Sequence, residues 1–148
     1  MKFNLKGTII GGVLGGIAAL VVGFVFNFVW SAIFPKYMSL MSELGGLRPY
    51  EDPLMTVFIF GQPFVFALAM AIAYNWMKPA CVCGKEGKCN RMCRGAIYGA
   101  LVWFVAQVPA AFTIYTSMDY PLLVVAGWLI GPLFTYPIAG MIIAKFAE

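Results

Sequence analysis

The sequence predicts an all-α integral membrane protein, a bundle of four transmembrane helices that forms one membrane domain over residues 1–148. Two observations support this prediction. Hydrophobic residues make up 62% of the chain, with a mean hydropathy of +0.87. All 10 basic and 6 acidic side chains lie outside four stretches that each exceed the ~20 apolar residues needed to cross a hydrocarbon core. The predicted spans are 7–34, 53–77, 95–118 and 121–144.

The first span is expected to pack closely against other helices. Small or polar residues occupy every fourth position along it. In lipid, helix association depends on close backbone approach, which small residues at this spacing allow. Packing within the chain and a seam between copies in a homo-oligomer are both open. The glycines predicted to pack are Gly7, Gly11, Gly15 and Gly23 in this span, and Gly95 and Gly99 in the third.

The two halves of the chain share local patterns. A basic residue directly precedes the first span and the third span, and each of these spans opens with two glycines four positions apart. The second and fourth spans both begin with Pro-Leu and carry a further proline in their interior. These matches suggest two related helical hairpins, arranged as a parallel repeat. Chance similarity between glycine-rich membrane helices is the alternative.

Three spans carry an internal proline at matching depth. At ~1.5 Å per residue, each proline lies ~15 Å from the outer end of its span, near the middle of a membrane. Proline lacks a backbone N–H, so the carbonyl four residues earlier loses its helical donor. These prolines are Pro63, Pro109 and Pro132.

Uncharged polar side chains gather near the same level. They either bond neighbouring helices or line a small polar cavity, because broken helices at one depth mark substrate sites in transporters. A neutral solute, a lipid headgroup and a quinone are all compatible with such a cavity. The candidate residues are Asn27, Gln62, Gln107 and Tyr136.

All four cysteines lie in the loop 78–94, with the spacing C-x-C-x5-C-x3-C. Four thiolates suit a tetrahedral Zn²⁺ ion or an iron–sulfur cluster, and we expect zinc ahead of iron–sulfur. The alternatives are free thiols, reversible palmitoylation at the membrane edge, and a thiol–disulfide relay. The predicted metal ligands are Cys81, Cys83, Cys89 and Cys93.

The placement of lysine and arginine predicts the orientation. Eight basic residues lie at the two ends of the chain and in the loop 78–94, against two in the loop 35–52. We therefore expect a protein of the cytoplasmic (inner) membrane with both termini and the cysteine loop in the cytoplasm. This topology accounts for the net charge of +4, so no nucleic-acid partner is expected.

The composition argues against several classes of enzyme and pump. The chain contains no histidine, which removes histidine bases, metal ligands and Ser-His-Asp arrangements. The predicted spans contain no charged side chain, and proton relays usually need such groups inside the membrane. The sequence therefore favours a non-enzymatic protein.

The second half of the chain carries a pattern of spaced glycine, tryptophan and proline: Gly95, Gly99, Trp103, Pro109 and Pro121. With its short polar turn and glycine-rich last span, this half resembles a small prokaryotic membrane family of unknown function. The segment from Trp30 to Lys36 partly matches the end of that family's first span, with Pro35 displaced. The resemblance implies a four-span fold and no activity, and it does not include the cysteine loop.

The leading functional hypothesis is a small subunit or scaffold in the lipid bilayer, alone, as a homo-oligomer or in a larger membrane complex. Its cytoplasmic four-cysteine metal site would join the second span to the third. One alternative is a small carrier for a metal ion or neutral solute that uses the mid-membrane cavity. Another is a membrane redox protein with an iron–sulfur centre or reactive thiols.

Overall fold

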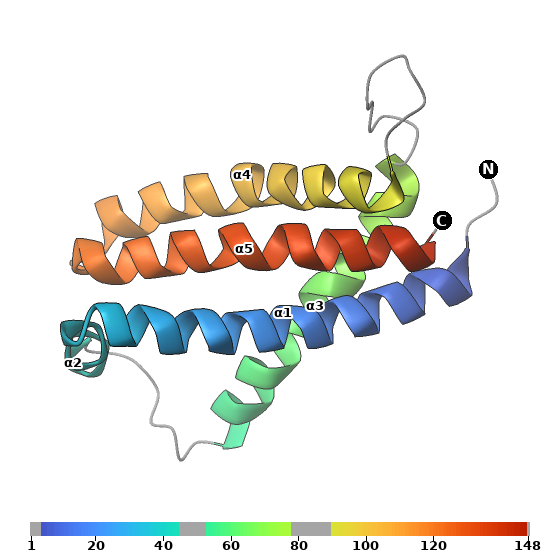
Figure 1. Cartoon of the computed structure of the whole chain (residues 1–148). Helices are drawn as coiled ribbons and strands as arrows, with labels where there is room; N and C mark the ends of the chain where they lie inside the picture. Colours follow the sequence, from blue (N-terminus) through green and yellow to red (C-terminus); the bar gives the residue numbers. More distant parts are fainter. Residues whose placement is uncertain (1–3, 45–52, 78–89, 148) are drawn as a thin grey trace.

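The computed structural model describes residues 4–44, 53–77 and 90–147, and these form helices without a strand (Figure 1). Four of the five helices in this part of the chain are long and apolar enough to cross a membrane. The prediction of an all-helical chain with four candidate spans is confirmed. The helices are α1 Leu5–Ile33, α2 Lys36–Glu43, α3 Pro53–Met77, α4 Arg91–Ser117 and α5 Leu122–Ala147.

The helices extend past several predicted span limits. Helix α4 begins at Arg91 rather than at residue 95, and α5 continues through Lys145. The sequence prediction limited the spans to uncharged stretches, whereas a helix can continue through charged residues at its ends. Helix α1 begins under a cap, because the Asn4 side chain accepts a hydrogen bond from the Gly7 backbone N–H at 3.0 Å.

Helix α2 was not expected from the sequence. It lies in the predicted loop 35–52 and packs against α1 and α5. Proline at its N-cap, Pro35, starts the helix, and Tyr37 is its one buried residue. The Tyr37 ring lies against α5 close to Gly127, where an added Cβ would lie 3.2 Å from the ring.

Helix α5 is central in the described arrangement. It packs along α1 and along α4, and these three helices run side by side, whereas α3 crosses them obliquely (Figure 1). Helix α3 packs mainly against α1 and less extensively against α5. Helix α1 therefore packs against α3, and α4 against α5, which are the two predicted hairpins. Two symmetric hairpins would also pack α3 along α4 in the way that α1 packs along α5, and the described helices do not do so.

The helices approach most closely where α1 and α4 begin and α3 and α5 end, which we call the glycine-packed end. Here α4 meets α5 backbone to backbone. A Cβ atom at Gly95 would overlap the carbonyl oxygen of Gly140, and one at Gly99 would overlap that of Tyr136. Glycine is required at both positions, because any side chain would push the two helices apart.

Helix α1 carries glycine on two faces. A Cβ at Gly11 would lie 3.3 Å from the Cα atom of Ile143 on α5, and one at Gly16 would lie 2.9 Å from the Cα atom of Phe64 on α3. This single helix thus joins two neighbours at short range. The glycines of the α5 face are Gly7, Gly11 and Gly15, and those of the α3 face are Gly12 and Gly16.

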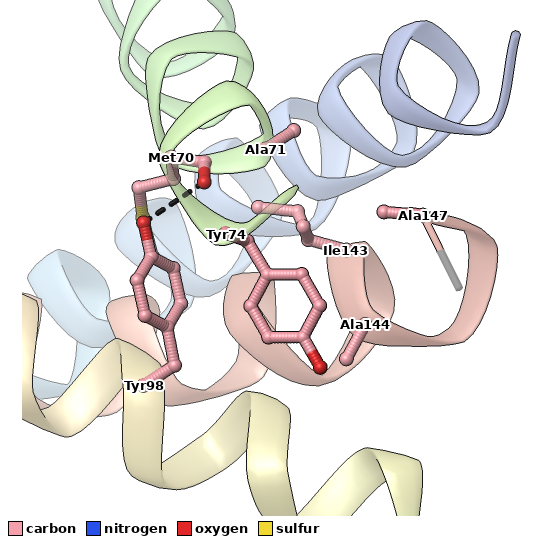
Figure 2. Close-up of a cluster of buried hydrophobic side chains, with 7 residues drawn as sticks. All are labelled: Met70, Ala71, Tyr74, Tyr98, Ile143, Ala144 and Ala147. Carbon is pink, nitrogen blue, oxygen red and sulfur yellow. Dashed lines mark hydrogen bonds between the residues drawn. The ribbon is translucent and has the colours of Figure 1, made fainter. Parts of the chain in front are cut away.

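Buried side chains of α3, α4 and α5 form a core at the glycine-packed end (Figure 2). The Tyr98 hydroxyl donates a hydrogen bond to the Met70 carbonyl at 2.9 Å, from α4 to α3. The Tyr74 and Tyr98 rings meet edge to face with centroids 5.2 Å apart. The cluster consists of Met70, Ala71, Tyr74, Tyr98, Ile143, Ala144 and Ala147.

A buried polar pair joins α3 to α1 at the same end. The Asn75 amide donates to the Thr8 hydroxyl at 2.6 Å and to the Ala71 carbonyl at 3.1 Å. The Thr8 hydroxyl in turn donates to the Asn4 carbonyl at 2.7 Å. Both side chains are buried and satisfied, so the pair contributes to stability without leaving an unpaired polar group.

At the opposite end of the bundle, which we call the cavity end, α3 is packed loosely. All the buried residues of α3 fall in its second half, from Ala67 onward, and Phe58 in the first half is 72% exposed. Gly23, which the sequence predicts as a packing position, does not pack: a Cβ there would meet no atom within 4 Å. The small residues at every fourth position of α1 form a ladder that winds around the helix, so at Gly23 this ladder no longer contacts a neighbouring helix.

Candidate functional site

A cavity of about 410 Å³ lies between the helices at the cavity end. This volume falls in the lower part of the ~300–1,000 Å³ range of small-molecule sites. Helices α1, α3 and α5 form most of its wall, and α4 contributes one side chain, Gln107. Gly23 lines the cavity, so the gap left by its missing side chain is part of the space.

All four residues that the sequence groups as a polar level line this one cavity: Asn27, Gln62, Gln107 and Tyr136. The Gln107 amide donates a hydrogen bond to the Tyr136 hydroxyl at 2.5 Å, from α4 to α5. Asn27 instead donates to the Gly23 carbonyl of its own helix at 2.9 Å, and Gln62 is exposed on the α3 wall. The structure therefore brings the residues together, with a bonded pair on one side and two accessible amides on the other.

Two of the three predicted proline breaks belong to the cavity. Pro63 and Pro132 line it, together with Ile59 and Trp128, whose carbonyls lose their helical donors to these prolines. Pro109 does not line it, because it lies on an exposed face of α4. The cavity thus combines two weakened helices with the amides of a polar level.

Aromatic rings form the rest of the wall, and all of them except Tyr136 were not predicted as site residues. Phe66 packs on the Tyr136 ring with centroids 4.2 Å apart, and Phe24 meets Phe60 at 6.0 Å across α1 and α3. The sequence shows several aromatic residues near these prolines, but it does not show which of them face inward. The aromatic residues that line the cavity are Phe24, Phe26, Phe60, Phe66, Trp128 and Tyr136.

The cavity is neutral. Every lining residue is uncharged, and the polar groups of the lining residues are amides, hydroxyls, main-chain carbonyls and the indole N–H of Trp128. Such groups bind by hydrogen bonds and cannot neutralise an ionic ligand, whose burial without a counter-charge would be costly. The arrangement also offers neither a metal-ligand set nor a nucleophile paired with a base, so binding is the chemistry it supports.

The predicted cysteine site lies largely outside the described residues, because Cys81, Cys83 and Cys89 fall in the segment 78–89. Cys93 is described: it is an exposed free thiol in the first turn of α4. Within residues 4–44, 53–77 and 90–147, no cluster of three or more cysteine, aspartate or glutamate side chains could hold a metal ion. The zinc and iron–sulfur hypotheses therefore stay predictions.

Comparison of the chain with protein-family models, with characterised proteins and with solved structures gives no match. The resemblance to a four-span prokaryotic family therefore stays a prediction, and function must be argued from the cavity itself.

Proposed function

We propose that this chain is a non-enzymatic membrane protein whose four long helices cross a lipid bilayer and enclose a binding cavity for a small neutral molecule. The observation that carries the proposal is the uncharged cavity of about 410 Å³ with the hydrogen-bonded pair Gln107 and Tyr136 in its wall. Binding sites in membrane proteins commonly lie where helices are broken near mid-membrane, which matches the positions of Pro63 and Pro132.

The described charges support an orientation for this protein. The exposed basic residues Lys6, Arg91 and Lys145 lie at the glycine-packed end, whereas the acidic residues Glu43 and Asp119 and one basic residue, Lys36, lie at the cavity end. Basic residues favour the cytoplasmic side, so we propose an inner-membrane protein with the cavity in the outer half of the bilayer. A cysteine placed at Asp119 in a cysteine-free variant should react in intact cells with a membrane-impermeant maleimide, and one placed at Lys6 should not.

The binding proposal is tested with a matched pair of glycine variants. A Cβ at Gly23 or at Gly61 would meet no atom within 4 Å, yet only Gly23 lines the cavity. Gly23→Leu should therefore fill the cavity, and Gly61→Leu should leave it open at equal helix content.

Native mass spectrometry of the protein released from lipid nanodiscs should show a bound neutral small molecule on the parent and on Gly61→Leu. It should show none on Gly23→Leu. Absence of any bound molecule from the parent, or equal retention by both variants, would contradict the binding proposal.

A scaffold role with a four-cysteine metal site is a second candidate. It is favoured by the position of Cys93, exposed in the first turn of α4 at the end of the bundle where α3 also ends. A metal held by the loop would join these two helix ends, and its binding free energy would add to folding. Metal content of the anaerobically purified parent and of Cys93→Ser tests it: about one zinc per chain should fall sharply in the variant.

A further inference from the structure

We propose that the cavity binds the ring of a neutral carbonyl compound dissolved in the bilayer, the chemistry of a quinone headgroup. This inference rests on the proposed binding function and specifies its ligand. It concerns binding alone and involves no electron transfer. Four properties of the wall lead to it: a free hydrogen-bond donor, the lack of charge, the aromatic surface and the exposed side of the cavity.

The donor comes from the pair Gln107 and Tyr136. The Gln107 amide N–H donates to the Tyr136 hydroxyl oxygen, so the hydroxyl hydrogen remains available to an acceptor in the cavity. If the amide turned by 180°, the hydroxyl would donate to Gln107 and the amide would keep its N–H groups free. In either arrangement the pair offers a donor to a ligand carbonyl.

The lack of charge argues against anionic headgroups and transition-metal ions as ligands. A phosphate would need arginine, lysine or a helix N-terminus, and none of the lining residues is basic. A transition-metal ion is usually bound through thiolate, imidazole or carboxylate groups, and these are missing from the lining. A neutral ligand leaves the wall without an unpaired charge.

The aromatic surface favours a ring over a small polyol. Rings from α1, α3 and α5 line the space, and the Phe66 ring packs at a tilt against the Tyr136 ring, with centroids 4.2 Å apart. Aromatic side chains contact a planar ligand over a large area, with offset or edge-to-face geometry. A polyol would bring more hydroxyl groups than the few polar groups of this wall can satisfy.

The exposed side gives a ligand a route from the bilayer. Asn27 on α1 and Phe60 and Gln62 on α3 belong to the lining, and all three are exposed. A molecule dissolved in lipid can therefore enter sideways between these helices without crossing the packed end. A hydrophobic tail would remain in the bilayer while the polar ring occupies the cavity.

The test uses a short-tailed benzoquinone whose ring carbons are all substituted, so that it does not add to the thiols of the chain. Titration into the parent protein in detergent should give saturable quenching of tryptophan fluorescence, because Trp128 lines the cavity. An alkylbenzene with the same tail and no carbonyl should not compete. Tyr136→Phe keeps the ring against Phe66, and its combination with Gln107→Leu removes both groups of the donor pair. This double variant should raise the Kd about tenfold, the loss expected for one hydrogen bond.

The glycine pair again serves as the control. Gly23→Leu should abolish saturable quenching, and Gly61→Leu should bind as the parent does. Equal Kd values for the parent and the double variant Gln107→Leu/Tyr136→Phe, or full competition by the alkylbenzene, would overturn the carbonyl-ring proposal. A parent that still carries another neutral molecule, lost in Gly23→Leu, would retain the binding function and reject only this ligand class.

Discussion

Glycine occurs at both ends of the bundle, but its surroundings differ. At the glycine-packed end, the nearest atoms to an added Cβ at Gly95, Gly99 or Gly140 are backbone atoms of the facing helix. At the cavity end, Gly131 faces the Phe26 ring, and Gly23 faces open space. The same residue type therefore packs against backbone at one end, whereas at the other it either contacts a ring or leaves open space, depending on the facing helix.

This difference assigns separate roles to the two ends. At the glycine-packed end, close packing holds α1 and α4 to α5. The buried hydrogen bonds of Asn75 and Tyr98 hold α3 to α1 and to α4. The resulting frame supports Tyr136, because its backbone lies against Gly99 while its hydroxyl reaches the cavity wall. A stable frame thus positions a binding group in a region that is otherwise loosely packed.

The largest expected effect comes from a bulky residue at the glycine-packed end. Gly99→Leu would force α4 away from the Tyr136 backbone, and we expect a loss of at least about 3 kcal/mol of stability, enough to prevent assembly. Gly61→Leu places the same side chain where no atom lies within 4 Å. Unfolding titrations in mixed micelles that gave equal stability for the two variants would remove the contrast between the ends.

Two asparagines test the contrast with polar groups. Asn75 is buried and bonded to Thr8 across two helices, so Asn75→Leu should cost about 1.5 kcal/mol of unfolding free energy. Asn27 is exposed and bonds only its own helix, so Asn27→Leu should change stability by less than about 0.5 kcal/mol. The same titration measures both variants, and a larger loss for Asn27→Leu would reverse our assignment of the two ends.

The smallest expected effects concern two tryptophans. The Trp103 indole donates to the Leu129 carbonyl at 2.8 Å, so Trp103→Phe should lose about 0.6 kcal/mol beyond its change in packing. The Trp30 indole nitrogen is buried and makes no hydrogen bond within the described residues. Trp30→Phe therefore removes an unsatisfied donor and should be better tolerated, which thermal unfolding of the two variants will show.

The sequence predicted the four candidate spans because charge is excluded from them, and this signal is strong over twenty or more residues. It missed α2, since eight residues with charged ends and a single buried ring carry no comparable signal. It also predicted that the four polar residues of the cavity lie together, because the depth of each proline and amide can be counted along its span.

The sequence could not predict which glycines would pack, because contact depends on the facing helix. Gly15 and Gly23 are equivalent in a ladder of period four, yet only Gly15 has a neighbour, Ile143 at 3.2 Å from an added Cβ. The aromatic wall escaped prediction for the same reason. Which side of α3 faces inward depends on its oblique crossing, which residue periodicity alone does not determine (Figure 1).

The most direct test of the contrast between the ends is the unfolding free energy of Gly95→Ala and Gly23→Ala, measured side by side in the same micelles. A methyl group at Gly95 would overlap the Gly140 carbonyl, so we predict a loss of about 2 kcal/mol. A methyl group at Gly23 enters open space and replaces glycine inside a helix, so we predict a gain of up to about 1 kcal/mol. Changes of the same sign and similar size would contradict the account.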